Sequence, residues 1–475
     1  MLFNSLFFIV FFSVFFMLYW KVFNKTVKTQ NMLLLFASYY FYLESGYIFL
    51  ILLILSSTLN YFIAIAIEKT NKNQLRNGLF IIGLLQGIGL LLIFKYNNVL
   101  SNIFNLFYEG ISGNELNFTL KLLVPLGISF YTFRTLGYLI DVYQEKRDAC
   151  KDWLIFFNYV SFFPSILAGP IDNSNRFIPQ LEKKRVFNYT IAVEGCQQFL
   201  WGLFKKIVIA DNCTPITSQI FQNYTHESSS TLILGAFLFT IELYADFSGY
   251  SDMAIGIGKN LGLKITKNFN YPYFATSISD FWRRWHISLT GWLTEYVYTP
   301  LTFILRKHKK TGLVIAILIN FILSGIWHGS KKTYLMFGLL HGIYFIPSII
   351  KSKKNVVRSR FFDFLNRLLT FTIVMLTFTF FKCDTLNQSI TFIKNIFSPT
   401  ILSLPQLYDS EKFGVISISI FIMFMLEWIH REDDFGFTLI KLKNKTLKKG
   451  LIYLLAFIVL YFGSYDSNQF IYFQF

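Results

Sequence analysis

The chain has 475 residues, of which 54% are hydrophobic and 19% are aromatic, and its mean hydropathy is +0.47. A soluble protein of this length cannot bury so much apolar surface, so the composition excludes that class and predicts a polytopic membrane protein. The net charge of +17 comes from basic residues in short loops between apolar runs. This distribution is typical of topology signals, whereas a nucleic-acid-binding protein needs a contiguous basic face.

Apolar runs close to the length of a bilayer recur along the whole chain. They cover residues 2–20, 47–67, 79–94, 232–244, 313–327, 361–381, 415–428 and 451–462. At about 20 residues per span, these runs and several shorter segments predict an all-α protein with roughly 11 transmembrane helices plus re-entrant helices.

The basic residues also predict the orientation of the chain. Clusters within residues 21–28, 69–76, 146–151, 306–310, 351–360 and 441–449 are expected on the cytoplasmic side. Residues 101–117 and 215–230 carry few or no basic residues and are expected outside, which places both termini outside. The first apolar run lacks a basic leader and a cleavage site, so we interpret it as a retained span, and we expect the inner membrane of a bacterium.

The middle of the chain, residues 124–345, combines Gly, Pro, Asp, Arg, His and Trp with apolar surroundings. Irregular backbone is tolerated at membrane depth only where protein or water covers it, so this block is expected to line an internal cavity. We predict a single membrane domain, 1–475, with N-terminal spans in 1–93, a core in 94–345 and C-terminal spans in 346–475.

One helix of this core is predicted to carry a polar stripe. Tyr131, Arg134, Tyr138 and Asp141 recur at spacings of three and four and therefore share one helical face. An ion pair between Arg134 and Asp141 that holds helices together is the favoured interpretation, and a direct role in a substrate tunnel is the alternative.

The next stretch, residues 161–181, contains three prolines, and Pro164 and Pro170 are expected to break any helix there. This segment is predicted to be re-entrant, with a plain loop as the alternative.

Asp246, Ser248 and Asp252 stand near the end of a predicted span. Two carboxylates at this spacing suit a metal site or an acid and base couple, but no third ligand is evident. Helix caps or salt bridges to nearby arginines are therefore favoured. The four cysteines show no ligand spacing, so no metal site is predicted and the cysteines are interpreted as packing residues.

The stretch FWRRWHISLTGW, residues 281–292, places two arginines and a tryptophan beside His286. Arg283 and Arg284 offer guanidinium groups to the phosphates of a donor, and with Trp285 they are predicted to bind it. The alternative is that both arginines only extend to the membrane interface as topology signals.

His328 lies in SGIWHG, where Gly325 and Gly329 leave room beside the imidazole. An ionisable residue at membrane depth is a candidate for function, so His286 and His328 are the predicted catalytic residues. A hydrogen-bonded core histidine is the alternative for each, and it is the favoured interpretation for His341 in LLHG.

From about residue 94 onwards, the chain resembles the bacterial alginate O-acetyltransferase branch of the membrane-bound O-acyltransferase (MBOAT) family. The resemblance is carried, in this order, by FYTFRTLGYLIDVY, LAGPI, FKKIVIAD, YADFSGYSDMAIGIG, NFNYPYFATSISDFWRRWHISLTGWLTEYVYTPL, SGIWHG, GLLHG and FIYFQF.

The resemblance implies a bundle of helices around a central funnel, in which a cytoplasmic thioester donor and an outer hydroxyl acceptor meet at His328. His286 is the second functional histidine by the same comparison. A neutral imidazole can accept the proton of an attacking hydroxyl near pH 7, and a narrow tunnel protects the acyl group from hydrolysis.

The expected donor is acetyl-CoA or another acyl thioester, with no tightly bound cofactor. The expected acceptor is a cell-wall or secreted polysaccharide such as peptidoglycan or alginate, reached directly or through an extracytoplasmic partner transferase. D-alanyl transfer to teichoic acid is the alternative within the family.

A transporter or flippase of lipid-linked sugars is the alternative from another class, although no inverted repeat is visible. Donor turnover separates the two classes, because an acyltransferase cleaves a thioester and a flippase moves an intact substrate.

Overall fold

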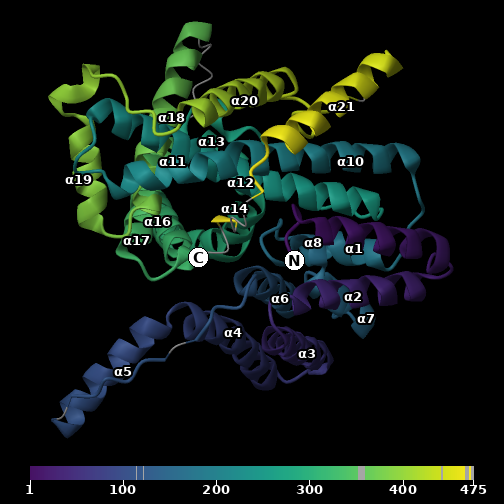
Figure 1. Cartoon of the computed structure of the whole chain (residues 1–475). Helices are drawn as coiled ribbons and strands as arrows, with labels where there is room; N and C mark the ends of the chain where they lie inside the picture. The colour runs from purple at the N-terminus through teal and green to yellow at the C-terminus, as the bar shows by residue number, and fades with distance from the viewer. Residues whose placement is uncertain (114, 121, 351–358, 440–441, 466–469, 472–475) are drawn as a thin grey trace. The chain divides into compact units, whose positions relative to one another are not determined.

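The computed structural model describes the chain except for residues 114, 121, 351–358, 440–441, 466–469 and 472–475 (Figure 1). Every regular element of the described residues is helical, which confirms the all-α prediction. Within the described residues, seven helical segments are long and apolar enough to cross a membrane, so this is a multi-pass membrane protein: Tyr47–Lys69, Asn73–Lys95, Ser229–Asn260, Arg306–His328, Lys332–Ile350, Arg360–Lys382 and Ser410–Ile429. Leu6–Val22 is a shorter apolar segment.

Seven is fewer than the roughly 11 spans predicted from sequence. Some apolar stretches form helices that are shorter than a span or that change their winding. The core helix α6 (Ile128–Tyr143) has 16 residues, and α10 (Tyr189–Leu203) has 15 before the chain becomes π-helical.

The chain forms two compact units, and the predicted single membrane domain with its three parts stays a prediction. The first unit comprises residues 1–192 and 258–265, and the second comprises residues 193–257 and 266–474. The helices that lie in the first unit are α1 (Leu6–Met17), η1 (Leu18–Val22), α2 (Val27–Leu43), α3 (Tyr47–Lys69), α4 (Asn73–Lys95), α5 (Asn97–Ser112), α6, α7 (Trp153–Ser161), α8 (Phe163–Ile166) and α9 (Ser174–Leu181).

The second unit holds the remaining helices, and α10 and α12 extend a few residues into the first unit. After α10 they are η2 (Phe204–Ala210), α11 (Asp211–Gln222), α12 (Ser229–Asn260), η3 (Pro272–Phe274), α13 (Ile278–Arg284), α14 (Ile287–Leu293), η4 (Thr294–Tyr298), α15 (Thr299–Ile304), η5 (Arg306–His308), α16 (Lys309–His328), α17 (Lys332–Ile350), α18 (Arg360–Lys382), α19 (Leu386–Ile396), η6 (Pro399–Leu402), α20 (Ser410–Ile429) and α21 (Lys445–Phe462).

In the first unit, Arg134 is buried, and a carboxylate other than the predicted one lies beside it. Its Nη2 donates to the Ser165 hydroxyl and to the Pro170 carbonyl oxygen (3.1 Å), and it lies 3.7 Å from Asp172 Oδ2. The predicted partner, Asp141, accepts hydrogen bonds from Ser174 and Asn175 of α9. The carboxylate found beside Arg134 is thus Asp172, which the irregular segment after α8 supplies together with the Pro170 carbonyl oxygen, and the pair with Asp141 stays a prediction.

The predicted break in residues 161–181 is confirmed. Helix α7 ends at Ser161, the short α8 has Pro164 in its first turn, and the chain becomes helical again only at Ser174. The Arg134 guanidinium donates to the Pro170 carbonyl oxygen within this break. A buried cation thus satisfies a backbone group that lies outside the helices. Whether the segment is re-entrant stays a prediction.

Helices α16 and α17 cross closely in the second unit and lie side by side in Figure 1. A Cβ atom added to Gly325 would meet the carbonyl oxygen of Tyr334 at 2.3 Å, and one added to Gly338 would meet that of Phe321 at 2.3 Å. Small residues at such a crossing let two backbones approach each other in a membrane. This crossing fixes the end of α16, where His328 is the last helical residue.

Candidate active site

His286 occupies the sharp turn between α13 and α14. Helix α13 begins at the cap Ser277, whose hydroxyl accepts the Asp280 N–H (3.1 Å), and the chain leaves the helix at Trp285 in an extended conformation. His286 itself has φ 45° and ψ 50°. This left-handed conformation costs a non-glycine residue about 1–2 kcal/mol, and such strain often marks a functional position.

The turn is attached to the preceding loop by two backbone hydrogen bonds. The N–H of Asn270 donates to the carbonyl oxygen of Arg284 (2.9 Å), and the N–H of Ile287 donates to that of Asn268 (2.8 Å). The side chain of Asn268 also reaches the turn, with its Oδ1 3.2 Å from His286 Nδ1 and 2.9 Å from Ser288 Oγ. The stretch NFN therefore holds His286 in place.

The His286 ring lies in an aromatic environment. The ring of Phe247 meets it edge to face at a centroid distance of 4.7 Å, and the Trp327 ring lies at 5.9 Å. Only 1% of the residue is exposed, and burial lowers the pKa of His286 to about 3. Burial therefore favours the neutral imidazole, which has a lone pair on one of its ring nitrogens.

His328 ends α16, and the next residue explains why the helix stops there. Gly329 has φ 150°, a conformation that side chains rarely adopt, so the glycine of the WHG stretch allows the chain to turn away. The His328 ring is buried against Phe381 (4.8 Å between centroids) and Trp327 (4.6 Å). Since Trp327 contacts His286 as well, both predicted catalytic histidines border one indole.

The three residues predicted to bind the donor have different surroundings. Arg283 is exposed, and its Nη2 donates to Ser279 Oγ (3.3 Å). Arg284 is paired with Asp280 one turn earlier, with 2.9 Å between Nε and Oδ1. Trp285 is buried and stacks on Phe281 at 5.4 Å between centroids, which favours a packing role. Donor binding by these residues stays a prediction.

His341 lies within the same aromatic region on α17 and is completely buried. The Trp282 Nε1–H donates a hydrogen bond to His341 Nδ1 (3.3 Å), and the Phe337 ring lies 4.7 Å from the imidazole. His341 therefore has the environment of the hydrogen-bonded core histidine that the sequence favoured.

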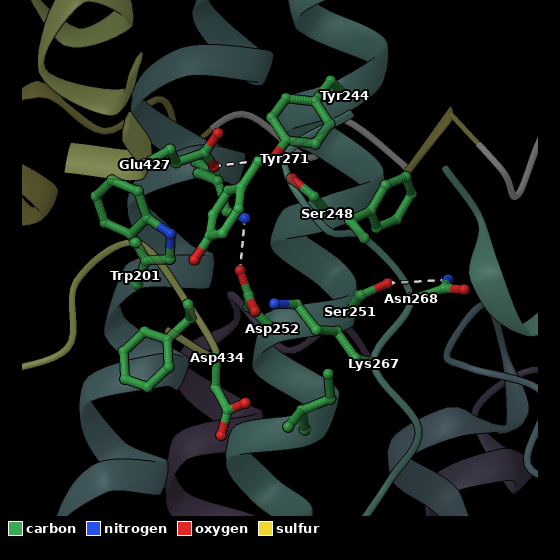
Figure 2. A pocket seen from close by; sticks show the side chains of 15 residues that line it. Trp201, Tyr244, Ser248, Ser251, Asp252, Lys267, Asn268, Tyr271, Glu427 and Asp434 are labelled. Carbon is green, nitrogen blue, oxygen red and sulfur yellow. Dashed lines mark hydrogen bonds and ion pairs between the residues drawn. The ribbon is translucent and has the colours of Figure 1, made fainter. Parts of the chain in front are cut away.

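A polar pocket lies on the other side of Asn268 and holds several residues that we did not select from the sequence (Figure 2). Lys205 Nζ is 2.5 Å from Asp252 Oδ2, and the Tyr244 hydroxyl donates to Glu427 Oε1 (2.9 Å). On the side of the histidine turn, Asn268 Nδ2 donates to Ser251 Oγ (3.2 Å). The labelled lining residues are Trp201, Tyr244, Ser248, Ser251, Asp252, Lys267, Asn268, Tyr271, Glu427 and Asp434.

Two signals for this pocket were present in the sequence. Glu427 is an acidic residue near the end of the apolar run 415–428, and FKKIVIAD places two lysines in another apolar stretch. An ionisable residue in such a run requires a partner, so both pointed to a buried polar site.

The second of these lysines, Lys206, forms a separate buried cluster. Its Nζ lies 2.6 Å from Asp246 Oδ1 and 2.8 Å from Asp211 Oδ1. Asp246 and Asp252 are thus paired with lysines and not with arginines, and both stand well inside α12, whose apolar window is 83% buried. The predicted arginine partners are wrong because α10 and η2 bring two lysines onto this helix.

In the described part of the chain, no group of three His, Cys, Asp or Glu side chains is arranged to hold a metal ion. The four cysteines are free thiols; Cys150, Cys213 and Cys383 are buried and Cys196 is exposed.

Comparison with known proteins finds a family model whose match includes both histidines. The sequence model of "MBOAT, membrane-bound O-acyltransferase family" matches residues 151–382. A peptidoglycan O-acetyltransferase of Helicobacter pylori is 34% identical over 392 residues, which cover 76% of this chain and 73% of the relative. The probable alginate O-acetylase AlgI of Pseudomonas aeruginosa is 33% identical over 81% of this chain and 73% of its own. A teichoic acid D-alanyltransferase of Bacillus subtilis is 29% identical over 54% of this chain and 68% of its own.

Proposed function

The chain belongs to the membrane-bound O-acyltransferase family, and on that premise we propose that it moves an acetyl group from a cytoplasmic thioester to a hydroxyl of an extracytoplasmic polysaccharide. The observation that carries the proposal is the approach of two buried histidines, His286 and His328, to the same Trp327 indole (5.9 and 4.6 Å between ring centroids). The bacterial relatives support the inner membrane of a bacterium as its location.

In the proposed reaction, His328 accepts the proton of the acceptor hydroxyl while its oxygen attacks the carbonyl carbon of the thioester. The C–S bond breaks, and the proton passes from the imidazole to the leaving sulfur, so an ester and a thiol form with no net change in protons. The aromatic rings around His328 support this role, because they keep water away from the thioester.

The donor is proposed to be acetyl-CoA or another acyl thioester that enters from the cytoplasm. Of the three predicted donor residues, Arg283 is the best placed to contact phosphate because its side chain is exposed, whereas Arg284 is already paired with Asp280. A guanidinium group binds a phosphate through two parallel hydrogen bonds.

The acceptor is proposed to be a cell-wall or secreted glycan, with transfer either direct or through an extracytoplasmic partner transferase. Two of the relatives that support it are named for O-acetylation of peptidoglycan and alginate, and they match this chain over 76% and 81% of its length. The D-alanyltransferase matches over 54%, so D-alanyl transfer is the second candidate.

The test is release of free coenzyme A from acetyl-CoA by the purified protein in detergent or nanodiscs, with peptidoglycan or alginate oligosaccharides as acceptors. We expect release that requires both an acceptor and His328, with none from His328→Ala. A parallel reaction with D-alanyl thioester on a carrier protein tests the second candidate. Movement of an intact lipid-linked sugar across proteoliposomes without thioester cleavage would overturn the proposal in favour of a flippase.

A further inference from the structure

Asn268 lies in a loop but is fully buried, and both polar atoms of its carboxamide make hydrogen bonds. Its Oδ1 lies 3.2 Å from the Ser288 backbone N, 2.9 Å from Ser288 Oγ and 3.2 Å from His286 Nδ1. Its Nδ2 donates to Ser251 Oγ on α12 at 3.2 Å. One carboxamide thus connects the histidine turn to the longest helix of the second unit.

These contacts determine which end of the carboxamide is oxygen. The backbone N–H of Ser288 can only donate, so the Asn268 atom that faces it must be the acceptor oxygen. His286 Nδ1 faces the same oxygen, and a carbonyl oxygen cannot donate a hydrogen bond. The ring nitrogen must therefore carry the proton, and the neutral imidazole has its lone pair on Nε2.

We propose that Asn268 is the positioning residue of His286: its carboxamide oxygen holds the imidazole proton on Nδ1, so that Nε2 is the ring nitrogen able to accept a proton. The inference rests on the proposed function, whose reaction step assigns the hydroxyl proton to His328 and leaves the part of His286 open. It specifies which nitrogen reacts, and it assigns that choice to a residue 18 positions earlier in the chain.

The orientation matters because a histidine with the opposite tautomer is useless as a base at the same position. A proton on Nε2 would meet a substrate hydroxyl donor to donor, and catalysis would wait for the proton to move. Asn268 also limits rotation of the His286 ring. Ser288 and Ser251 bind the two ends of the carboxamide and fix its orientation beside the ring.

The decisive variant is Asn268→Asp, which retains an acceptor oxygen for Ser288 but introduces a carboxylate beside Nδ1. An adjacent negative charge stabilises the imidazolium form, and a protonated Asp would donate to Nδ1 and move the ring proton to Nε2. The imidazolium form and the form with its proton on Nε2 both lack a lone pair on Nε2, and low pH favours both forms. We expect the acid limb of the kcat/KM profile to move to higher pH, with activity reduced about tenfold at pH 6 relative to wild type and largely recovered at pH 8.5.

The elements around His286 carry several titratable and charged side chains: Glu242, Asp246, Asp252 and Lys259 of α12, Lys267 and Tyr271 of the loop, Asp280, Arg283 and Arg284 of α13, and Lys309, Lys310 and His328 of α16. They are identical in wild type and variant. A shift between the two profiles therefore reports position 268.

Asn268→Leu removes the acceptor oxygen at nearly constant volume and should lower kcat by about 10- to 100-fold with little change in either KM. Asn395→Ala is the control, because it removes another partly buried asparagine side chain, which donates to the Tyr224 carbonyl oxygen (3.5 Å) and not to the histidine turn. It should retain wild-type kcat. Thermal unfolding of each purified variant excludes misfolded material from the comparison.

The outcomes separate this inference from the proposed function. If wild type cleaves no thioester, the proposed function fails. If wild type is active and His286→Ala is inactive, but the Asn268→Asp profile superimposes on that of wild type, the function stands and the role of Asn268 is overturned. Equal losses in kcat at every pH for Asn268→Asp and Asn268→Leu would also overturn it, since a merely structural residue behaves in that way.

Discussion

His286 and His341 are both buried and both enclosed by aromatic rings, yet Nδ1 has opposite roles in their hydrogen bonds. His286 Nδ1 faces a carboxamide oxygen and carries the proton, whereas His341 Nδ1 accepts the Trp282 N–H and carries the lone pair. The Nδ1 lone pair of His341 is therefore used in an internal hydrogen bond, whereas the lone pair of His286 is on Nε2. Burial is the same in the two regions, so the atom type of the partner distinguishes a candidate base from a core residue.

The largest effect is expected from His328→Ala, which removes the imidazole proposed to take the hydroxyl proton. We expect kcat to fall by about 10²- to 10⁴-fold while KM for acetyl-CoA changes little, because the loss is in the transition state. Steady-state coenzyme A release measures both constants. Turnover at the wild-type rate would contradict the role of His328.

His286→Ala should follow, with a loss in kcat/KM of about 100-fold. His286→Gln is the matched control for volume, and it should be equally inactive because an amide is not a base near pH 7. Recovery of activity in the Gln variant would mean that His286 only binds or packs, and the contrast with His341 would disappear.

His341→Ala should act mainly on stability. Truncation leaves the Trp282 N–H without its acceptor and opens a cavity among aromatic rings, which together cost about 2–4 kcal/mol in the free energy of unfolding. Thermal unfolding should fall by several degrees while turnover per folded molecule stays within about threefold of wild type. A large loss of kcat in folded His341→Ala protein would place this histidine beside His286 in function.

The smallest effects are expected from the two arginines. Arg283→Ala should raise KM for acetyl-CoA by about tenfold if the exposed guanidinium binds phosphate, since one charge-assisted contact contributes about 1.5 kcal/mol. Arg284→Ala breaks a partly exposed pair with Asp280 and should change stability by about 0.5 kcal/mol or less. If neither variant changes KM but the orientation of the loop in the membrane changes, both arginines are topology signals.

Several parts of the structure could be predicted because they depend on local chemistry. The helix broke near Pro164, as the sequence indicated, and the apolar run 313–327 ended within one residue of the end of α16. The all-α membrane class followed from composition, and membership of the acyltransferase family followed from the order of the motifs.

The parts that could not be predicted depend on contacts between distant segments. Arg134 was assigned to Asp141 because they share a helical face, but Asp172 reaches its guanidinium from an irregular segment whose conformation no periodicity encodes. Asn268 stood inside a recognised stretch without a role, since its contact with His286 requires the left-handed turn at residue 286.

The cluster around Lys206 has a consequence for the order in which the protein is made. Asp246 Oδ2 accepts the N–H of Ile471, which lies 225 residues further along the chain, and Lys206 Nζ stands 4.2 Å from the centre of the Phe470 ring. Lys206, Asp211 and Asp246 are close in sequence, so the ammonium can meet both carboxylates as soon as α12 has been synthesised. Asp246 Oδ2 and the Lys206 ammonium gain their contacts with Ile471 and Phe470 only after α13 to α21 have been synthesised. Assembly of the second unit is therefore completed after translation has passed its histidines, and a ribosome that stalls before residue 470 leaves a chain with both histidines and an unfinished ion cluster.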